Sequence, residues 1–380
     1  MDFKLSEDHI LLQESYRDFA ISQVKPMAAE IDEEEKFPVE TVKMMGELGF
    51  LGIPVPDELG GAGVDNLSYV TCVEELSKVC ASTGVIVSAH TSLCVEPIMA
   101  HGTDEQKQKY IPNLASGNWI GAFGLTEPGA GTDASMQSMV AENKGDHYLL
   151  NGSKIFITNA GYARVYVIMA MTDKSRGTKG ISAFIVEEGF TGFKIGTKER
   201  KMGIRGSATC ELIFENCIVP KENLLGQEGK GFKIAMQTLD GGRIGIAAQA
   251  IGIAQGAIDE TVRYTRERIQ FGKRISQFQN TQFQLAEMQA RVDAARLLVY
   301  RAACAKDAKE PYGHLAAMAK LVASETASDV ARRCVQLFGG YGYSRDYPVE
   351  RMMRDAKITE IYEGTSEVQK MVISNWMDVK

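Results

Sequence analysis

Glu363 is the residue of this sequence with the clearest capacity for chemistry. It lies in KITEIYEGTSEVQKM, residues 357–371, where three apolar residues before it have helical spacing: Ile358, Ile361 and Tyr362. Gly364 then predicts the end of that helix, and Ser366 with Gln369 predicts a capping box that begins another helix. A carboxylate at such a corner, beside apolar neighbours, can face a cleft. Desolvation there raises its pKa and makes it a better general base near neutral pH.

The same segment has a second interpretation. Glu360, Glu363 and Glu367 lie close together with Lys357 and Lys370, and charges arranged in this way usually form a solvated helix face. On this segment alone, the solvated face is the favoured interpretation.

A glycine-rich stretch follows a strand-like run in the middle of the chain. Gly129, Gly131 and Ala134 match the spacing of the dinucleotide fingerprint GxGxxA. The chain continues into further strand-like runs and not into a β-α-β unit, so we reject a Rossmann fold. The sequence TEPGAGTD, residues 126–133, instead predicts a turn. Its hydroxyl and backbone N–H groups either face a ligand or only close a β-turn.

Three sites in the last third of the chain have both an ordinary and a functional interpretation. GGYGY, residues 339–343, is typical of a helix C-cap and also of a loop that holds phosphate. Arg268, shortly before Phe271, either caps helix carbonyls or binds a phosphate through two hydrogen bonds. Asp240 and Arg243 have i, i+3 spacing, so they form a salt bridge or contact a ligand.

Composition excludes several classes of protein. The 380 residues carry a net charge of −7 and no basic run, which argues against a nucleic-acid partner. The 7 cysteines include no CxxC pair and the 5 histidines have no metal-ligand spacing, so we expect neither a disulfide framework nor a metal. The first ten residues do not read as a signal peptide, and no run of 18 apolar residues predicts a membrane span. We therefore expect a cytoplasmic protein.

Periodicity divides the chain into three regions. Residues 1–120 read as helical, with a buried apolar helix over residues 85–100. Residues 121–228 hold short runs rich in β-branched and aromatic residues, which predicts an all-β barrel or sandwich. Residues 229–380 return to the helical period in four long segments: 232–268, 281–309, 316–338 and 349–377. We therefore predict a multidomain α+β fold with an N-terminal helical domain, a central β-barrel domain and a C-terminal four-helix bundle.

Six stretches in this order resemble the acyl-CoA dehydrogenase family over the entire chain. They are AFGLTEPGAGTDAS from Ala122, NGSKIFITNAG from Asn151, LDGGRIGIAAQAIGIAQGA from Leu239, RIQFGK from Arg268, QLFGGYGYSRDYPVERMMRDAK from Gln336 and IYEGTSE from Ile361. The match looks closest to the short-chain branch, the butyryl-CoA dehydrogenases of anaerobic bacteria. That family has the same helical, β and helical layout.

The resemblance implies a bound FAD between the β domain and the C-terminal helices. Residues of this chain that match its flavin contacts are Phe123, Leu125, Thr126, Gly131, Thr132, Phe156, Ile157, Thr158, Thr365 and Glu367. Many relatives carry Trp where this chain has Phe156. In the family, a second group of residues contacts the FAD of a neighbouring subunit. The residues of this chain that match that group are Arg268, Phe271, Phe278, Gln279, Gln336, Leu337, Gly339 and Gly340. These shared sites imply a homotetramer built as a dimer of dimers.

The resemblance also assigns the substrate site and the base. The matching contacts to the acyl-CoA thioester are Thr132, Asp240, Arg243, Tyr362 and Gly364. Glu363 matches the catalytic base, which reverses the preference for a solvated acidic face. Some branches of the family place the base just before the bundle arginine, where this chain has Gly242. A glycine cannot act as a base, so the resemblance leaves Glu363.

The implied reaction removes the α-proton of a short-chain acyl-CoA and transfers hydride from its β-carbon to the flavin. Butyryl-CoA would give crotonyl-CoA, or the reverse reduction would run. The implied electron partner is an electron-transferring flavoprotein, which bifurcates electrons in some anaerobic relatives. Alternatives on the same scaffold are an aryl-propenoyl-CoA reductase and an acyl-CoA oxidase; a non-catalytic CoA- or flavin-binding scaffold is the alternative from another class.

Overall fold

Helices form the first region of the chain in this computed structural model, which describes residues 4–379. They are α1 (Glu7–Phe19), α2 (Ala28–Glu33), α3 (Val39–Glu47), α4 (Asn66–Val79), α5 (Ala81–Ser88), α6 (Glu96–His101) and α7 (Asp104–Ala115). Side chains cap several of their first turns, because those N–H groups have no partner within the helix. Asp65 accepts from the N–H of Ser68 at α4, and Thr103 forms a capping box with Gln106 at α7. Residues 1–3 lie outside the described residues. They belong to the first ten residues, in which we expected no signal peptide.

The buried helix predicted over residues 85–100 is confirmed. Helix α5, the π-helical turn η4 (Ala89–Val95) and α6 form one apolar run, and every residue of α5 and η4 is buried. Among the described residues, Ala81–His101 is the one helix long and apolar enough to cross a membrane by length and composition. Its most apolar window is 83% buried inside the protein, which is typical of a core helix.

Eight strands form the sheet of the middle region. They are β1 (Gly121–Gly124), β2 (Val140–Asn143), β3 (His147–Thr158), β4 (Val165–Met171), β5 (Ile181–Glu187), β6 (Phe193–Lys198), β7 (Thr209–Pro220) and β8 (Leu224–Leu225). Their order is β6-β7-β3-β2-β4-β5-β8, and β1 pairs with β4 in parallel. The β3–β7 ladder shifts register between Lys154 and Ile157, a β-bulge that changes the direction of the strand's side chains.

Long helices form the last region: α8 (Gly231–Glu267), α9 (Gln279–Asp307), α10 (Gly313–Phe338), α11 (Val349–Ile358) and α12 (Ser366–Trp376). A short hairpin of β9 (Ile269–Gln270) and β10 (Lys273–Arg274) connects α8 to α9. The fourth predicted helix, residues 349–377, is wrong as one element. Helix α11 ends at Ile358, six residues before the end predicted at Gly364, so the helix face expected over Ile358, Ile361 and Tyr362 is also wrong. The predicted order of helical, β and helical regions is confirmed.

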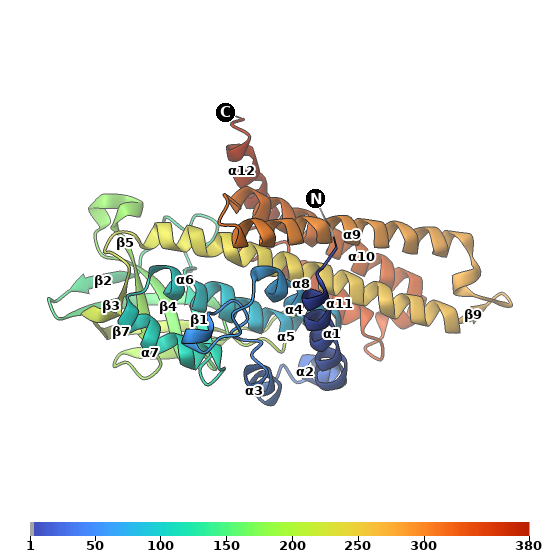
Figure 1. Cartoon of the computed structure of the whole chain (residues 1–380), viewed down its shortest axis with the longest axis horizontal. Coiled ribbons are helices and arrows are strands. Elements are labelled where there is room, and N and C mark those ends of the chain that lie inside the picture. The colour runs from blue at the N-terminus through green and yellow to red at the C-terminus, as the bar shows by residue number, and fades with distance from the viewer. Residues whose placement is uncertain (1–3, 380) are drawn as a thin grey trace.

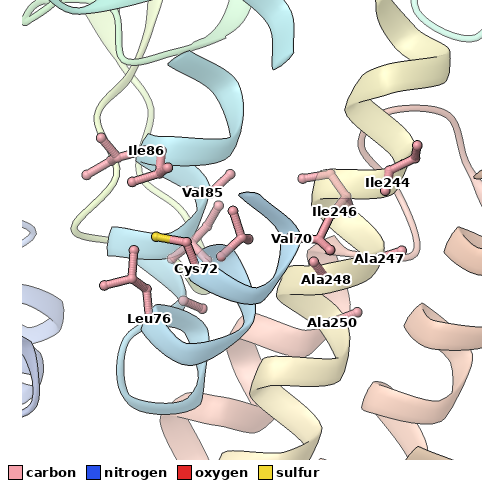
Figure 2. Close-up of a cluster of buried hydrophobic side chains, with 14 of the residues drawn as sticks. Val70, Cys72, Leu76, Val85, Ile86, Ile244, Ile246, Ala247, Ala248 and Ala250 are labelled. Carbon is pink, nitrogen blue, oxygen red and sulfur yellow. The ribbon is translucent and has the colours of Figure 1, made fainter. Parts of the chain in front are cut away.

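One hydrophobic cluster joins the first and last regions (Figure 2). It brings together side chains of α4, α5 and α8: Val70, Cys72, Leu76, Val85, Ile86, Ile244, Ile246, Ala247, Ala248 and Ala250. Burying each larger apolar side chain of this kind contributes about 1.5–3 kcal/mol. The helices approach so closely that a Cβ at Gly252 would lie 2.5 Å from the carbonyl oxygen of Glu74. Helix α8 is therefore held rigidly against the N-terminal helices.

The elongated shape of the molecule separates its two ends. Figure 1 shows the sheet at one end and the β9 hairpin at the other, with α8 running between them. Helix α8 has 37 residues, which corresponds to about 55 Å at 1.5 Å per residue. Groups at the two ends of α8 therefore cannot contact the same small molecule within one chain.

Candidate functional site

Glu363 lies in a tight corner between α11 and α12. The N–H of Tyr362 donates to the carbonyl of Ile358 over 3.1 Å, and the backbone then becomes left-handed, with φ of 56° at Glu363 and 91° at Gly364. Thr365, not Ser366, caps α12 by accepting from the N–H of Val368 over 3.4 Å. The predicted Ser366–Gln369 capping box is therefore wrong. The helix begins at Ser366, one residue earlier than that pattern requires.

Gln369 has a different role from the predicted cap. Its amide is 0% exposed and donates to the carbonyl of Glu363 over 3.1 Å and to that of Gly364 over 2.8 Å. Lys320 of α10 is also 0% exposed and donates to the Gly364 carbonyl over 2.7 Å. Sequence reasoning missed both contacts. A lone lysine within the alanine-rich run HLAAMAKLVASETA was the available signal for Lys320.

The carboxylate of Glu363 points inward. Its Oε2 atom is excluded from solvent and has no hydrogen-bond partner among the described residues. Burial raises the pKa of Glu363 to about 7, against the opposing effect of the positive charges of Arg243 and Lys320. Glu367, in contrast, is exposed and its pKa is lowered by local hydrogen bonds. The solvated acidic face thus describes Glu367 and not Glu363.

The backbone of α8 passes directly beside this carboxylate. A Cβ built on Gly242 would lie 2.8 Å from Glu363 Oε2 and 2.8 Å from Leu93 Cδ2. Leu93 belongs to η4 and is buried. Glycine at position 242 therefore provides the space that the carboxylate occupies, and the apolar wall formed by Leu93 contributes to its desolvation.

Asp240 and Arg243 lie on the same face of α8. Arg243 is 5% exposed and its Nη1 donates to Asp240 Oδ1 over 2.5 Å, so the predicted i, i+3 ion pair is present. Its Nε has no partner among the described residues. Asp240 also lines a hollow of about 450 Å³ with His101, Gln237 and Tyr312. An ion pair at the edge of a hollow leaves room for the predicted ligand contact as well.

The two sequence segments predicted to line the flavin lie side by side. Lys154 Nζ donates to the carbonyl of Leu125 over 3.1 Å, and the N–H of Ile155 donates to the carbonyl of Thr126 over 2.9 Å. The bulge in β3 gives Phe156 a φ of 59° and leaves its ring 60% exposed. Ile157 is buried and Thr158 half-buried, so Ile157 can offer a ligand only its backbone.

This surface suits a flat aromatic ligand with polar edges. A Cβ on Gly129 or Gly131 would meet no atom within 4 Å, so the glycine turn borders open space. Phe156 provides an exposed aromatic face, and Thr126 and Thr158 are half-buried in the same segments. Phe123 and Leu125 are nearly buried at 9% and 8% exposure and close the side toward the core. Thr132 is exposed in the turn between these segments and β2.

The residues expected to reach a neighbouring subunit's FAD gather at the opposite end of the bundle. The guanidinium of Arg268 stacks 5.4 Å from the Tyr341 ring centroid, and Phe271 is 94% exposed on the β9–β10 hairpin. Gly339, with φ of 64°, is the C-cap of α10, so the cap interpretation of GGYGY is correct. Most residues of this loop, 339–343, are exposed. Also at this end are Phe278, Gln279, Gln336, Leu337 and Gly340.

These residues cannot complete the flavin surface of their own chain. Arg268 follows Arg243 by 25 positions along α8, or about 37 Å at helical rise. Figure 1 shows the β9 hairpin far from the sheet. The structure therefore brings the predicted site residues together in two groups. One surrounds Glu363 and the β1–β3 surface, and the other lies at the bundle tip.

Comparisons with known proteins agree with this geometry. The chain matches the N-terminal, middle and C-terminal domains of acyl-CoA dehydrogenases over residues 6–118, 122–217 and 229–377. A short-chain specific acyl-CoA dehydrogenase of Clostridium acetobutylicum is 62% identical over 98% of this chain and 99% of that protein. Butyryl-CoA dehydrogenase from Megasphaera elsdenii has a solved structure with a TM-score of 0.98 and 51% identity, covering 99% of this chain and 100% of that one.

A chain in a further solved structure has a TM-score of 0.98 and 56% identity, covering 99% of each chain. That structure is described as the electron transferring flavoprotein of Acidaminococcus fermentans, toward a mechanism of flavin-based electron bifurcation. Each of these likenesses covers almost the whole length of both chains. This chain belongs to the acyl-CoA dehydrogenase family.

Proposed function

We propose that this chain is a FAD-dependent dehydrogenase of short-chain acyl-CoA thioesters. In one direction it would convert butyryl-CoA to crotonyl-CoA, and in the other it would reduce the enoyl thioester. The observation that carries the proposal is the Glu363 carboxylate, which is desolvated, has an oxygen without a partner and has a pKa raised to about 7. The relatives at 62% and 51% identity support the short-chain substrate class.

Glu363 acts as the base in this proposal. A thioester α-proton is weakly acidic, so the base needs a pKa near the working pH and a dry position close to the α-carbon. Burial against Leu93 and Gly242 supports the raised pKa and the dry position of this carboxylate. Asp240 and Arg243, beside the hollow at α8, would contact the CoA thioester, together with Thr132, Tyr362 and Gly364. FAD, when bound, supplies the acceptor for the hydride that leaves the β-carbon.

The flavin would lie against the β1–β3 surface, with Phe123 to Thr132 and Phe156 to Thr158 on its sides and Thr365 and Glu367 near the corner. Because Arg268 and its neighbours are at the far end of α8, they would contact the FAD of another copy. The separation of these two groups supports a homo-oligomer, and we propose a tetramer that is a dimer of dimers. The chain would then have three domains, over residues 1–120, 121–228 and 229–380, which together bind the substrate and the flavin.

An electron-transferring flavoprotein is the proposed redox partner. The structural relative from Acidaminococcus fermentans supports such a partner, and we propose that the partner is of the bifurcating kind. All seven cysteines are unpaired, which supports a cytoplasmic location because disulfides are rare in reducing compartments.

Anaerobic titration of the purified flavoprotein with saturated acyl-CoA esters of graded length tests the proposal. Butyryl-CoA should bleach the flavin absorbance and should outperform the C8 and C16 esters in turnover by more than about tenfold, or roughly 1.4 kcal/mol. A flat chain-length profile contradicts the short-chain assignment. Direct oxygen consumption would indicate the oxidase alternative. A preference for a bulky aryl-propenoyl-CoA would indicate the reductase alternative. If no ester bleached the flavin, the chain would be a non-catalytic scaffold.

A further inference from the structure

A buried lysine lies behind the Glu363 corner. Lys320 packs in α10 among fully buried alanines: Ala316, Ala317, Ala319 and Ala323. An ammonium group in such surroundings is costly unless its charge is compensated. The hydrogen bond that the structure gives Lys320 goes to a neutral acceptor, the Gly364 carbonyl, over 2.7 Å. Its positive charge must therefore be compensated by a group other than its hydrogen-bond partner.

The corner itself needs support. Glu363 and Gly364 both have left-handed backbone, with φ of 56° and 91°. A residue with a side chain adopts this conformation rarely, and it persists where the surroundings hold it. Lys320 holds the Gly364 carbonyl, and Gln369 holds both carbonyls of the corner over 3.1 and 2.8 Å. These two buried side chains fix the peptide that carries the proposed base.

The charges around the corner are few. Arg243 of α8 and Lys320 of α10 face the Glu363 carboxylate, and Glu360 and Glu367 of the same segment lie within electrostatic range of Lys320. Arg243 is already paired with Asp240. Burial lowers the pKa of Lys320 to about 8, and the charge of Glu363 is the largest effect that opposes it. Glu363 is thus the principal counter-charge of Lys320.

We propose that Lys320 is a positioning residue for Glu363: it fixes the Glu363–Gly364 corner through the Gly364 carbonyl, and its ammonium stabilises the carboxylate form of the base. This inference rests on the proposed function of Glu363 as the base. Gln369 shares the first role and carries no charge, so the two contributions can be separated. A lysine that only supported the fold would affect stability and not the titration of the base.

The test compares Lys320→Met with Gln369→Met. Turnover of butyryl-CoA per bound flavin is measured from about pH 5.5 to pH 9, together with flavin content and melting temperature. Both variants should lose at least about tenfold in turnover because the base is misplaced. Only Lys320→Met should move the acid limb of the pH profile toward higher pH, by at least about half a unit. Its melting temperature at pH 7 should fall, because the Gly364 carbonyl loses its donor and Glu363 loses its counter-charge.

Two results would overturn the inference: an acid limb of Lys320→Met that coincides with the wild type, or a loss of turnover that disappears when rates are expressed per bound flavin. Lys320→Gln is the second variant and covers the case in which Lys320→Met does not fold. It keeps a donor without the charge, and its acid limb must also shift. Glu363→Gln is measured in parallel. Near-normal turnover in that variant would reject the base itself, whereas an inactive Glu363→Gln beside a normal Lys320→Met rejects only the role of Lys320.

Discussion

Two glutamates in this molecule, each with a carboxylate oxygen shielded from water, have opposite environments. Glu127, in the turn after β1, is 2% exposed, and both of its oxygens are occupied. Lys154 Nζ donates to its Oε1 over 2.7 Å, and the N–H and hydroxyl of Ser138 donate to Oε2 over 2.6 and 2.7 Å. Although burial raises the pKa of Glu127, the charge of Lys154 and these hydrogen bonds lower it overall. The Glu363 carboxylate is also desolvated, but it has no comparable hydrogen-bond donors, so its pKa is raised.

The difference separates a structural carboxylate from a reactive one. A buried carboxylate with all its acceptors satisfied is a poor base, because protonation would break its ion pair and its hydrogen bonds. Glu127 uses those bonds to hold the turn that faces the proposed flavin. Glu363 keeps an unpartnered oxygen that can take a proton. Its corner is fixed through backbone carbonyls, so the carboxylate itself remains free.

Glu363→Gln should have the largest effect on turnover. Removing a general base typically costs up to about 10⁴-fold, which is about 5.5 kcal/mol, so we expect a loss of 10³–10⁴-fold (~4–5.5 kcal/mol) with butyryl-CoA. The variant should keep its flavin and its fold, because glutamine has the same shape and no charge to desolvate. Steady-state turnover and flavin absorbance measure both quantities. A variant with more than a tenth of normal turnover would contradict the reactive role of Glu363.

Lys154→Met should have the largest effect on stability. It leaves the Glu127 charge buried and unpaired, which typically costs about 3–5 kcal/mol in free energy of unfolding. Chemical denaturation of the flavin-loaded protein measures the loss. The double variant Lys154→Met with Glu127→Gln is the matched control, because it removes both charges and should recover part of the stability. If the single variant loses less than about 1 kcal/mol, the pair does not hold the turn in the way we describe.

Gly242→Ala should have an intermediate effect on turnover. Its new Cβ would lie 2.8 Å from Glu363 Oε2, so the carboxylate must shift. A displacement of the base by about 1 Å can cost up to roughly 10²-fold, and we expect a 10- to 100-fold fall in kcat with the fold intact. Gly241→Ala is the control, since its Cβ would meet the flexible ends of Glu96 and Lys306. Equal losses in the two variants would mean that general crowding of α8, and not displacement of Glu363, is responsible.

Local sequence patterns predicted the order of the elements and marked Glu363 as a candidate, but they favoured a solvated face for it, and only the resemblance to a family reversed that preference. The helical and strand periods gave the three regions because local side-chain spacing determines them. The capping pattern at Ser366 failed by one residue, because the neighbouring Thr365 is also a favoured cap residue and its extended backbone places it before the first turn. Lys320 precedes Gly364 by 44 positions and Glu127 precedes Lys154 by 27. Such pairings depend on how helices and strands pack, which the spacing of residues along the chain does not contain.

The smallest expected effect is a dependence on pH. Because the pKa of Glu363 is raised to about 7 in the folded protein, turnover should have an acid limb near pH 7 and be about tenfold below its plateau one unit lower. Glu127, with a lowered pKa, should contribute nothing to that limb.

Stability should respond to pH with opposite signs at the two carboxylates. The pKa of Glu363 in the folded state is above its ordinary value of 4.5, so its contribution to stability is complete below pH 4.5 and is lost as the pH rises through 7. Glu127 has a lowered pKa, so its contribution is present above its ordinary value and is lost as the pH falls through the folded-state pKa. Between about pH 5 and pH 8, the melting temperature of the wild type should therefore fall relative to that of Glu363→Gln as the pH rises. Parallel curves would mean that Glu363 titrates as an ordinary solvated carboxylate, and the contrast with Glu127 would then be lost.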